Sequence, residues 1–302
     1  MHVMTDLFPK IISLPPPVER ITNTPGKAIT DVLRLDMIHP VISGNKWFKL
    51  KYALETAQKE NYSRITTFGG AFSNHIVATA YACKQAGIRC RGIIRGEPTT
   101  PFTHSLLAAA NYGMEIEYMS RTDFRQLRED GFRLPGSDND YLIPEGGAFA
   151  AGVRGAKEIL EFVAVQNYSH IICAIGTGTT AAGLLQCLNP GQQLICINVL
   201  KGGSFQEKDI IGLSGKTGEN LVIRNEFHFG GYAHYTPELI QFMNTFYEDT
   251  GIPSDFVYTA KLFYAWQYIV ALEMNNADAR ILVIHSGGLQ GNASLFNGTL
   301  IF

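Results

Sequence analysis

Apolar and polar residues follow two patterns along the chain, one typical of strands and one typical of helices, and the two patterns alternate. Short apolar runs predict strands, and longer segments with apolar residues on one side predict helices. In the first half of the chain we expect strands at 28–35, 64–68, 90–94 and 115–119 and helices at 47–60, 73–86 and 103–112. Alternation at this short spacing is typical of right-handed βαβ units around a parallel sheet.

The pattern starts again after the loop Pro144-Glu145-Gly146-Gly147. Here we expect helices at 151–166, 180–188, 236–250 and 261–275 and strands at 170–175, 193–200 and 280–285. A chain of 302 residues, at about 150 residues per domain, also gives two domains. The sequence therefore predicts an α/β protein whose two halves meet near residues 145–152.

Charge and composition exclude several classes of function. The chain carries 25 basic and 27 acidic residues, a formal net charge of −2, so there is no positive excess to attract a nucleic acid. No segment reaches the roughly 18 consecutive apolar residues that a membrane span requires. The five cysteines form no C-x-x-C pair, so we expect neither a disulfide framework nor a metal site.

The N-terminal segment MHVMTDLFPKIISLPPPVER lacks the basic start and the unbroken apolar stretch of a signal peptide. Together these features predict a soluble, cytoplasmic protein without a nucleic-acid or membrane partner. In that compartment the cysteines are expected to be reduced, at Cys83, Cys90, Cys173, Cys187 and Cys196.

A glycine-rich turn between an expected strand and an expected helix is the sharpest candidate for a ligand site. Glycines let the backbone approach a ligand closely, and unsatisfied N–H groups at a helix start favour an anion such as phosphate. A structural turn without a ligand is the alternative. The turn consists of Gly176, Thr177, Gly178, Thr179 and Thr180.

The same turn matches the dinucleotide fingerprint G-x-G-x-x-A through Gly176, Gly178 and Ala181. That fingerprint requires an acidic residue at the end of the next strand, about 20 residues further on, to bind the ribose. The strand at 193–200 instead runs into Lys201-Gly202-Gly203. A phosphate site is therefore favoured over a dinucleotide site.

Three lysines lead into the helix expected at 47–60, namely Lys46, Lys49 and Lys51. Lys46 follows Gly44-Asn45 at the helix start, where the positive end of the helix dipole would lower the pKa of its amine. A lower pKa favours the nucleophilic free base. Taken alone, however, Lys46 is more simply explained as a surface charge.

Two further helix starts carry polar residues. Ser73 can cap the helix at 73–86, and Asn74 follows in its first turn, where a carboxylate or a ring oxygen could bind. Tyr258 and Thr259 precede the helix at 261–275, where packing and capping would explain them equally well.

Taken together and in this order, these segments resemble the 1-aminocyclopropane-1-carboxylate deaminase and D-cysteine desulfhydrase family of pyridoxal-phosphate enzymes. The matching stretches are GNKWFKLKYAL at 44–54, FGGAFSNH at 68–75, GTGTTAAGL at 176–184, DFVYTAK at 255–261 and HSGG at 285–288. The resemblance implies the two-domain fold of the tryptophan synthase β chain, called fold type II, with parallel sheets flanked by helices. It further implies a larger cofactor-binding domain at 1–48 and 152–302 and a smaller α/β domain at 49–151.

The resemblance also implies which residues bind the cofactor. Lys46 matches the lysine that forms the Schiff base with pyridoxal 5′-phosphate, and Asn74 matches the residue that hydrogen-bonds its O3′ atom. The turn at 176–180 matches the phosphate-binding loop. Gly287 and Gly288 match the turn beside the cofactor ring.

Other matches imply residues that act on the substrate. Ser73 matches the residue that contacts the substrate carboxylate and takes part in proton transfer. Tyr258 matches the tyrosine next to the cofactor ring, and Tyr232 falls where the family carries a second active-site tyrosine. Lys49 matches a family lysine that does not form the Schiff base. The implied catalytic residues are therefore Lys46, Ser73, Tyr258 and Tyr232.

The chain departs from the family at a position that affects the chemistry. Deaminases carry a glutamate next to the ring tyrosine, near the pyridine nitrogen, and here that position is Thr259. A hydroxyl leaves the nitrogen largely neutral, so this expected cofactor contact favours β-elimination over cyclopropane opening. Ser43 also replaces a family glycine, and the segment 120–141 is abbreviated or altered.

The sequence thus predicts a deaminase or lyase that releases a 2-oxo acid and ammonia from a small amino acid. Relatives commonly dimerise, so a homodimer is expected. Two alternatives stay open at this point: a catalytically silent protein that binds pyridoxal phosphate, and a nucleotide-dependent α/β enzyme.

Overall fold

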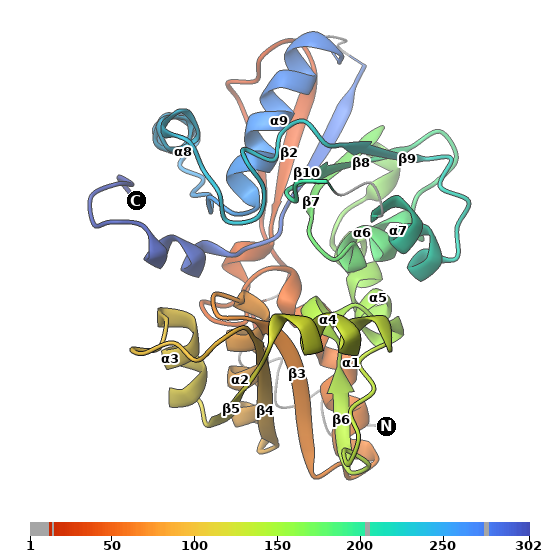
Figure 1. Ribbon diagram of the computed structural model, residues 1–302. Coiled ribbons are helices and arrows are strands. Elements are labelled where there is room, and N and C mark those ends of the chain that lie inside the picture. The colour runs from red at the N-terminus through yellow and green to blue at the C-terminus, as the bar shows by residue number, and fades with distance from the viewer. Residues whose placement is uncertain (1–11, 14, 203–205, 275–277) are drawn as a thin grey trace.

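The computed structural model describes residues 12–13, 15–202, 206–274 and 278–302. They form two α/β lobes, and Figure 1 shows the larger lobe above the smaller one. The larger lobe contains a six-stranded sheet and the smaller lobe a four-stranded sheet. The predicted α/β class, with two parallel-rich sheets flanked by helices, is confirmed.

The larger sheet takes strands from both ends of the chain. Its order is β1-β2-β10-β7-β8-β9, and all neighbours run parallel except β1 and β2. Because β2 precedes the smaller sheet in sequence and β7 follows it, the smaller lobe is an insertion between two strands of the larger sheet. The strands are β1 (Val18–Ile21), β2 (Ile29–Arg34), β7 (His170–Ile175), β8 (Gln193–Asn198), β9 (Leu221–Arg224) and β10 (Arg280–His285).

Helices cover both faces of the larger sheet, which explains why its central strands are apolar at nearly every position. In β7, Ile171 and Cys173 belong to one core with α5 and α6, whereas Ile172 and Ala174 belong to a second core with α8 and α9. The helices are α5 (Ala150–Lys157), α6 (Thr179–Leu185), α7 (Gln206–Ser214), α8 (Pro237–Thr250) and α9 (Thr259–Leu272).

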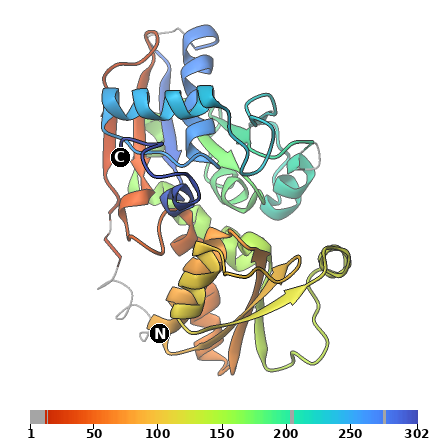
Figure 2. The same ribbon diagram turned by 60° about the vertical axis from the view of Figure 1, so that its left-hand side comes forward.

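The smaller sheet is parallel throughout and has the order β5-β4-β3-β6. Helices α1 and α2 pack on one face, and α4 lies on the other, as Figure 2 shows. The elements are α1 (Asn45–Lys59), β3 (Arg64–Gly70), α2 (Asn74–Ala86), β4 (Arg89–Arg95), α3 (His104–Asn111), β5 (Met114–Met119), α4 (Arg121–Glu129) and β6 (Asp140–Ile143).

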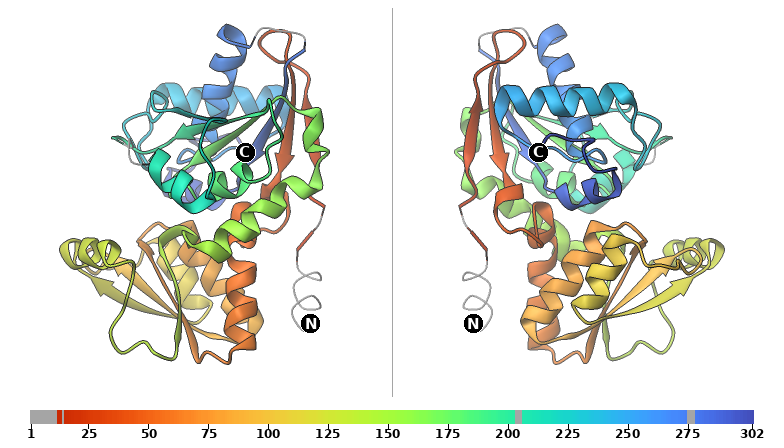
Figure 3. Two further views of the ribbon diagram at one scale, coloured as in Figure 1. Left: turned by 90° about the vertical axis from the view of Figure 1, so that its right-hand side faces the viewer. Right: turned by 90° about the vertical axis from the view of Figure 1, so that its left-hand side faces the viewer.

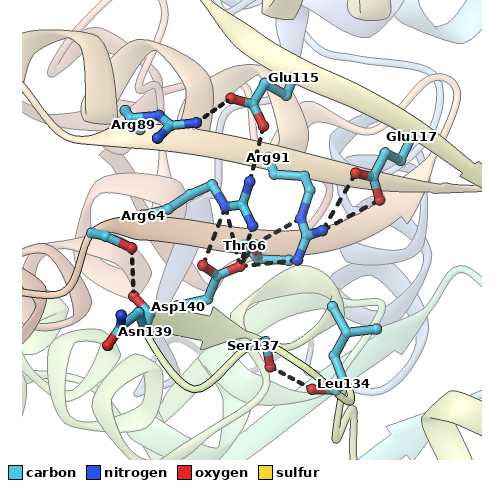
Figure 4. Close-up of polar contacts among 11 residues, drawn as sticks. Arg64, Thr66, Arg89, Arg91, Glu115, Glu117, Leu134, Ser137, Asn139 and Asp140 are labelled. Carbon is cyan, nitrogen blue, oxygen red and sulfur yellow. Dashed lines mark hydrogen bonds and ion pairs between the residues drawn. The ribbon is translucent and has the colours of Figure 1, made fainter.

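The outer face of the smaller sheet is divided between apolar and charged contacts. Phe68 of β3 packs against α4, whereas Thr66, two residues earlier, donates a 2.6 Å hydrogen bond to Asp140 of β6. Arg64 and Arg91 also donate to this carboxylate (Figure 4). Burial alone would raise the pKa of Asp140, but the hydrogen bonds from Thr66 and Arg64 hold it below its usual value. An ion-pair network therefore takes the place of a helix contact on this half of the face.

Most predicted elements are confirmed to within a few residues, with one clear exception. The helix predicted at 151–166 is wrong in its second half, because α5 ends at Lys157 and a 3-10 helix follows at Glu158–Phe162. Sequence analysis also misses β1, β6 and β9, which are strands of four residues each, and the helices α4 and α7. In α4 the buried side chains are Phe124 and Leu127, and all the other residues of this helix are polar or charged.

The altered segment 120–141 is ordered, since it contains α4 and the start of β6. The predicted end of the last helix at Asn275 lies outside the described residues, as do residues 1–11 of the N-terminal segment. The exact domain boundaries stay a prediction. Within the described part of the chain, no helix is long and apolar enough to cross a membrane.

Close backbone contacts fix α1 and α5 to each other where the lobes join, and Figure 3 shows α5 crossing between them. A Cβ atom on Gly155 of α5 would lie 1.7 Å from the carbonyl oxygen of Phe48 in α1. A Cβ atom on Gly183 of α6 would lie 2.6 Å from the Cβ of Ala156 in α5. The start of α1, which carries Lys46, is thereby fixed to the larger lobe.

We predict that Gly155→Ala destabilises the protein by about 1–3 kcal/mol, because α1 and α5 must move apart to admit the methyl group. Urea unfolding followed by tryptophan fluorescence measures the change. The matched control is Gly212→Ala in α7, where a Cβ atom would meet nothing within 4 Å. That substitution should stabilise the helix by up to about 1 kcal/mol. Equal effects of the two substitutions would contradict the close contact.

Candidate active site

The segments with polar residues meet where the two lobes face each other, beyond the carboxyl ends of β3, β7 and β10. A Cβ atom on Gly44 would lie 1.8 Å from the carbonyl oxygen of Ser286, and the N–H of Asn45 donates to the same oxygen at 3.1 Å. Across from them, Asn74 Nδ2 donates to the Gly288 carbonyl at 3.4 Å. Three segments far apart in sequence therefore form one site.

Lys46 lies at the start of α1, and one side chain joins its amine to the glycine-rich turn. Its Nζ donates to Asn45 Oδ1 at 2.6 Å, and Asn45 Nδ2 donates to Thr180 Oγ1 at 3.0 Å. Burial lowers the pKa of Lys46 from its usual 10.5 to about 8, although the carboxylate of Asp255 opposes this shift. More of this amine is uncharged near neutral pH than in an ordinary lysine, which suits a nucleophile.

Two buried titratable side chains lie near Lys46. Lys49 Nζ donates to the Gly146 carbonyl at 3.1 Å, and burial, assisted by the charge of Lys46, lowers its pKa well below the usual value. His75 Nε2 lies 3.0 Å from Thr67 Oγ1, and burial lowers the pKa of His75 to about 3. His75 is therefore uncharged at neutral pH.

Ser73 and Asn74 begin α2 at the edge of the site. Ser73 Oγ accepts a hydrogen bond from the N–H of Ile76 at 3.4 Å, which confirms Ser73 as the N-cap of α2. Asn74 is buried, and its Oδ1 has no hydrogen-bond partner among the described residues. Buried polar atoms normally have partners, so this amide is placed to contact a polar atom of a ligand.

The glycine-rich turn contacts both lobes. Thr177 and Thr179 place their hydroxyl oxygens 3.1 Å apart, and a Cβ atom on Gly146 of the smaller lobe would lie 2.6 Å from Thr177 Cγ2. The carbonyl of Gly176 accepts a 2.8 Å hydrogen bond from the buried Gln206. Sequence analysis misses Gln206 because it lies at the start of α7, a helix without a clear apolar period.

Tyr258 lies next to the glycine-rich turn. Its Oη would be 3.2 Å from a Cβ atom on Gly176, and its ring meets that of Tyr232 edge-on with centroids 6.0 Å apart. Burial raises the pKa of Tyr258 well above its usual value, so its hydroxyl keeps its proton. The structure thus brings Tyr232 and Tyr258 together beside the turn.

Thr259 is fully buried beside a carboxylate that sequence analysis gives no role. Its hydroxyl donates to Asp255 Oδ1 at 2.8 Å and accepts from the N–H of Asp255 at 2.7 Å. The same carboxylate accepts from the N–H groups of Val257, Tyr258 and Thr259. The Asp255 carboxylate therefore binds the N–H groups at the start of α9. An aspartate four residues before Thr259, at a helix start, is the signal in the sequence that could have revealed this role.

Gly287 and Gly288 form the turn after β10, and both have positive φ angles, of 76° and 103°. A Cβ atom on Gly287 would lie 2.7 Å from Ser43 Oγ, and one on Gly288 would lie 3.1 Å from Asp255 Oδ1. Side chains are therefore excluded from this turn. Ser43, which replaces the family glycine, donates its hydroxyl to the Asp36 carbonyl at 3.2 Å.

The end of β8 lacks the carboxylate that a dinucleotide site requires. Its last residue is Asn198, whose Nδ2 donates to Asn225 at 2.7 Å and whose Oδ1 accepts from the N–H of Leu200 at 2.9 Å. Both polar atoms of the Asn198 amide are thus hydrogen-bonded to other residues of the protein. The end of β8 therefore does not support a nucleotide-dependent enzyme.

The chain matches the family model for pyridoxal-phosphate dependent enzymes over residues 17–287 and belongs to that family. Within it, the chain is similar to a candidate 1-aminocyclopropane-1-carboxylate deaminase of Thermotoga maritima, with 30% identity over 283 residues that cover 86% of this chain and 88% of that protein. It is 26% identical to the D-cysteine desulfhydrase of Salmonella paratyphi A, covering 95% of this chain and 96% of the relative.

Solved structures support the same assignment. A structure described as an ACC deaminase homologue has a TM-score of 0.77 and 25% identity, with 97% of both chains covered. Serine racemase from Dictyostelium discoideum shares the fold with a TM-score of 0.63 at 19% identity, over 94% of this chain and 95% of that one. The expected family, the type II fold and the cofactor pyridoxal 5′-phosphate are therefore confirmed.

The residues of the site fit this cofactor. Lys46 offers a partly deprotonated amine for its aldehyde, and Asn74 offers an unpartnered amide for a polar atom of its ring. The glycine-rich turn offers N–H groups and the hydroxyls of Thr177 and Thr179 for its phosphate. The individual roles of these residues stay predictions.

Burial of Lys46 predicts a characteristic pH dependence in the protein stripped of cofactor. The folded chain releases the Lys46 proton near pH 8 and the unfolded chain near pH 10.5, so the unfolded state holds more protons between these values. Stability contributed by this group therefore rises with pH across that window. We expect Lys46→Met to be more stable than the wild type at pH 7, with a difference that narrows toward pH 10.5. Urea unfolding of both proteins measures this difference, and a difference in unfolding free energy that is the same at every pH would refute the prediction.

Proposed function

We propose that this chain is a pyridoxal-phosphate-dependent lyase that removes a β-substituent from a small amino acid and releases a 2-oxo acid and ammonia. The family membership supports the cofactor and the reaction class. The observation that carries the proposal is the link from the Lys46 amine through Asn45 to Thr180 of the glycine-rich turn, since it joins a nucleophilic amine to a phosphate-binding element.

Bound pyridoxal phosphate supplies a ring that delocalises the electron pair left on the substrate Cα when its proton leaves. In this proposal, the Lys46 amine would hold the cofactor at its aldehyde and would move the Cα proton, for which a pKa of about 8 is well matched. Ser73 and the first turn of α2 hold the substrate carboxylate, and the Ser73 hydroxyl is a second candidate for proton transfer. Asn74 orients the ring, and Tyr258 excludes water from its face.

Thr259 supports β-elimination over cyclopropane opening. It occupies the position at which family deaminases carry a glutamate, and it brings no formal charge of its own to the pyridine nitrogen. The Asp255 carboxylate behind it is occupied by its bonds to Thr259 and to three backbone N–H groups. A weaker charge at the nitrogen gives a weaker electron sink, which suits loss of a good leaving group better than opening of a ring.

The proposal includes a homodimer, as expected from the resemblance, and a cytoplasmic location, as expected from the cysteines and the N-terminal segment. Light scattering of the purified protein measures the oligomeric state directly.

The role of Lys46 predicts a visible absorption band in the purified enzyme, due to cofactor bound through a lysine amine. Lys46→Ala should lose this band, whereas Lys84→Ala, which removes an exposed lysine on α2, should keep it. A colourless wild-type protein that takes up no added cofactor would refute the proposed function. Retention of the band in Lys46→Ala would refute the role of Lys46.

We further predict that a β-substituted amino acid is the better substrate. D-Cysteine, D-serine, L-serine and 1-aminocyclopropane-1-carboxylate are compared side by side by measuring 2-oxo acid and ammonia. The best β-substituted compound should exceed the cyclopropane in kcat/KM by at least about tenfold, or about 1.4 kcal/mol of transition-state stabilisation. Activity on the cyclopropane alone would contradict the interpretation of Thr259. A bound cofactor without turnover of any amino acid would identify a silent binding protein.

A further inference from the structure

Lys261, in the first turn of α9, is a buried lysine that the reaction above does not use. Its side chain is 0% exposed, and its Nζ donates a 2.6 Å hydrogen bond to the carbonyl of Gly231. Burial lowers the pKa of Lys261 to about 8, an effect that the Asp255 carboxylate opposes. The acceptor is a backbone carbonyl and not a carboxylate, so the desolvation of this amine is not offset by an ion pair.

The carbonyl that Lys261 holds belongs to a strained loop. Within residues 228–235, which we call the Tyr232 loop, four residues have positive φ: Phe229 at 49°, Gly230 at 93°, Gly231 at 117° and Ala233 at 56°. For the two residues with side chains, this conformation costs on the order of 1–2 kcal/mol each. Such strain persists only where surrounding contacts determine the conformation.

The contacts that determine this loop converge on Gly231. Its N–H donates to the His228 carbonyl at 2.9 Å, and its carbonyl accepts from the N–H of His234 at 3.2 Å as well as from Lys261. A Cβ atom on Gly231 would lie 3.2 Å from the Cβ of Lys201. The loop backbone is thus held between α9 on one side and the chain after β8 on the other.

The residue that follows Gly231 is Tyr232, whose ring contacts Tyr258 beside the glycine-rich turn. Tyr232 is 39% exposed, and its side chain contacts Tyr258 through both its ring and its hydroxyl. Its place in the site therefore depends on this contact and on the backbone that carries it.

We propose that Lys261 is a positioning residue that clamps the Gly231 carbonyl and thereby holds the Tyr232 ring against Tyr258, at the substrate side of the site. The clamp itself is a property of the folded chain, whereas its effect on catalysis rests on the proposed function. The two are tested separately.

Amide hydrogen exchange tests the clamp without any need for activity. In Lys261→Met, which removes the donor but keeps the apolar stem, the amides of Gly231 and His234 should exchange at least about tenfold faster than in the wild type. Lys261→Gln keeps an N–H donor and should recover part of the protection. The matched control is Ala265→Gly, a fully buried position of the same helix that weakens α9 without touching the loop. Unchanged exchange in Lys261→Met, or equal loss in Ala265→Gly, would overturn the clamp.

A double-mutant cycle tests whether Lys261 acts through Tyr232. With the best amino acid of the substrate comparison, Lys261→Met and Tyr232→Ala should each lower kcat/KM by at least about tenfold, and the double variant should be no worse than the poorer single one. The visible cofactor band should stay in all three. Multiplicative losses would overturn the positioning role, and failure of the wild type to bind cofactor would refute the proposed function while leaving the exchange result to decide the clamp.

Discussion

The close approach of the start of α1 to the end of β10 is the constraint on which the site depends. Gly44 has no room for a side chain because the Ser286 carbonyl lies where its Cβ atom would be, and the Asn45 N–H donates to that carbonyl. Gly287 is in turn packed against Ser43. This contact sets the point at which α1 begins, and with it the position of Lys46 relative to the glycine-rich turn.

Three buried lysines share one electrostatic arrangement. Lys46, Lys49 and Lys261 are each desolvated and each donate to an uncharged oxygen, namely the Asn45 amide and the carbonyls of Gly146 and Gly231. On the same helix as Lys46, Lys51 instead pairs with the carboxylate of Glu158. A neutral acceptor fixes the direction of an amine without the negative charge that would hold its proton. The three buried lysines therefore share an arrangement that differs from the carboxylate pairing of Lys51.

Much of the fold could be predicted because the central strands are nearly continuous apolar runs and the long helices bury many apolar side chains. The short strands β1, β6 and β9 give too few positions for a period to appear, and the polar helix α4 buries little. At the site, Lys46, Ser73 and Asn74 could be found because each sits in a local motif. Gln206 and Lys261 could not, since the carbonyls they bind lie 30 residues away in the chain. A lysine that is buried in the fold has no signature in sequence that separates it from a solvated one.

The glycine contact between α1 and α5 has a mechanical consequence. α1 is held to the larger lobe at Phe48 and again at Gly44, and it also shares one apolar core with α2 and the sheet of the smaller lobe. A movement of one lobe relative to the other therefore separates α1 from at least one of these two sets of contacts. The helix that begins beside Lys46 thus couples the positions of both lobes.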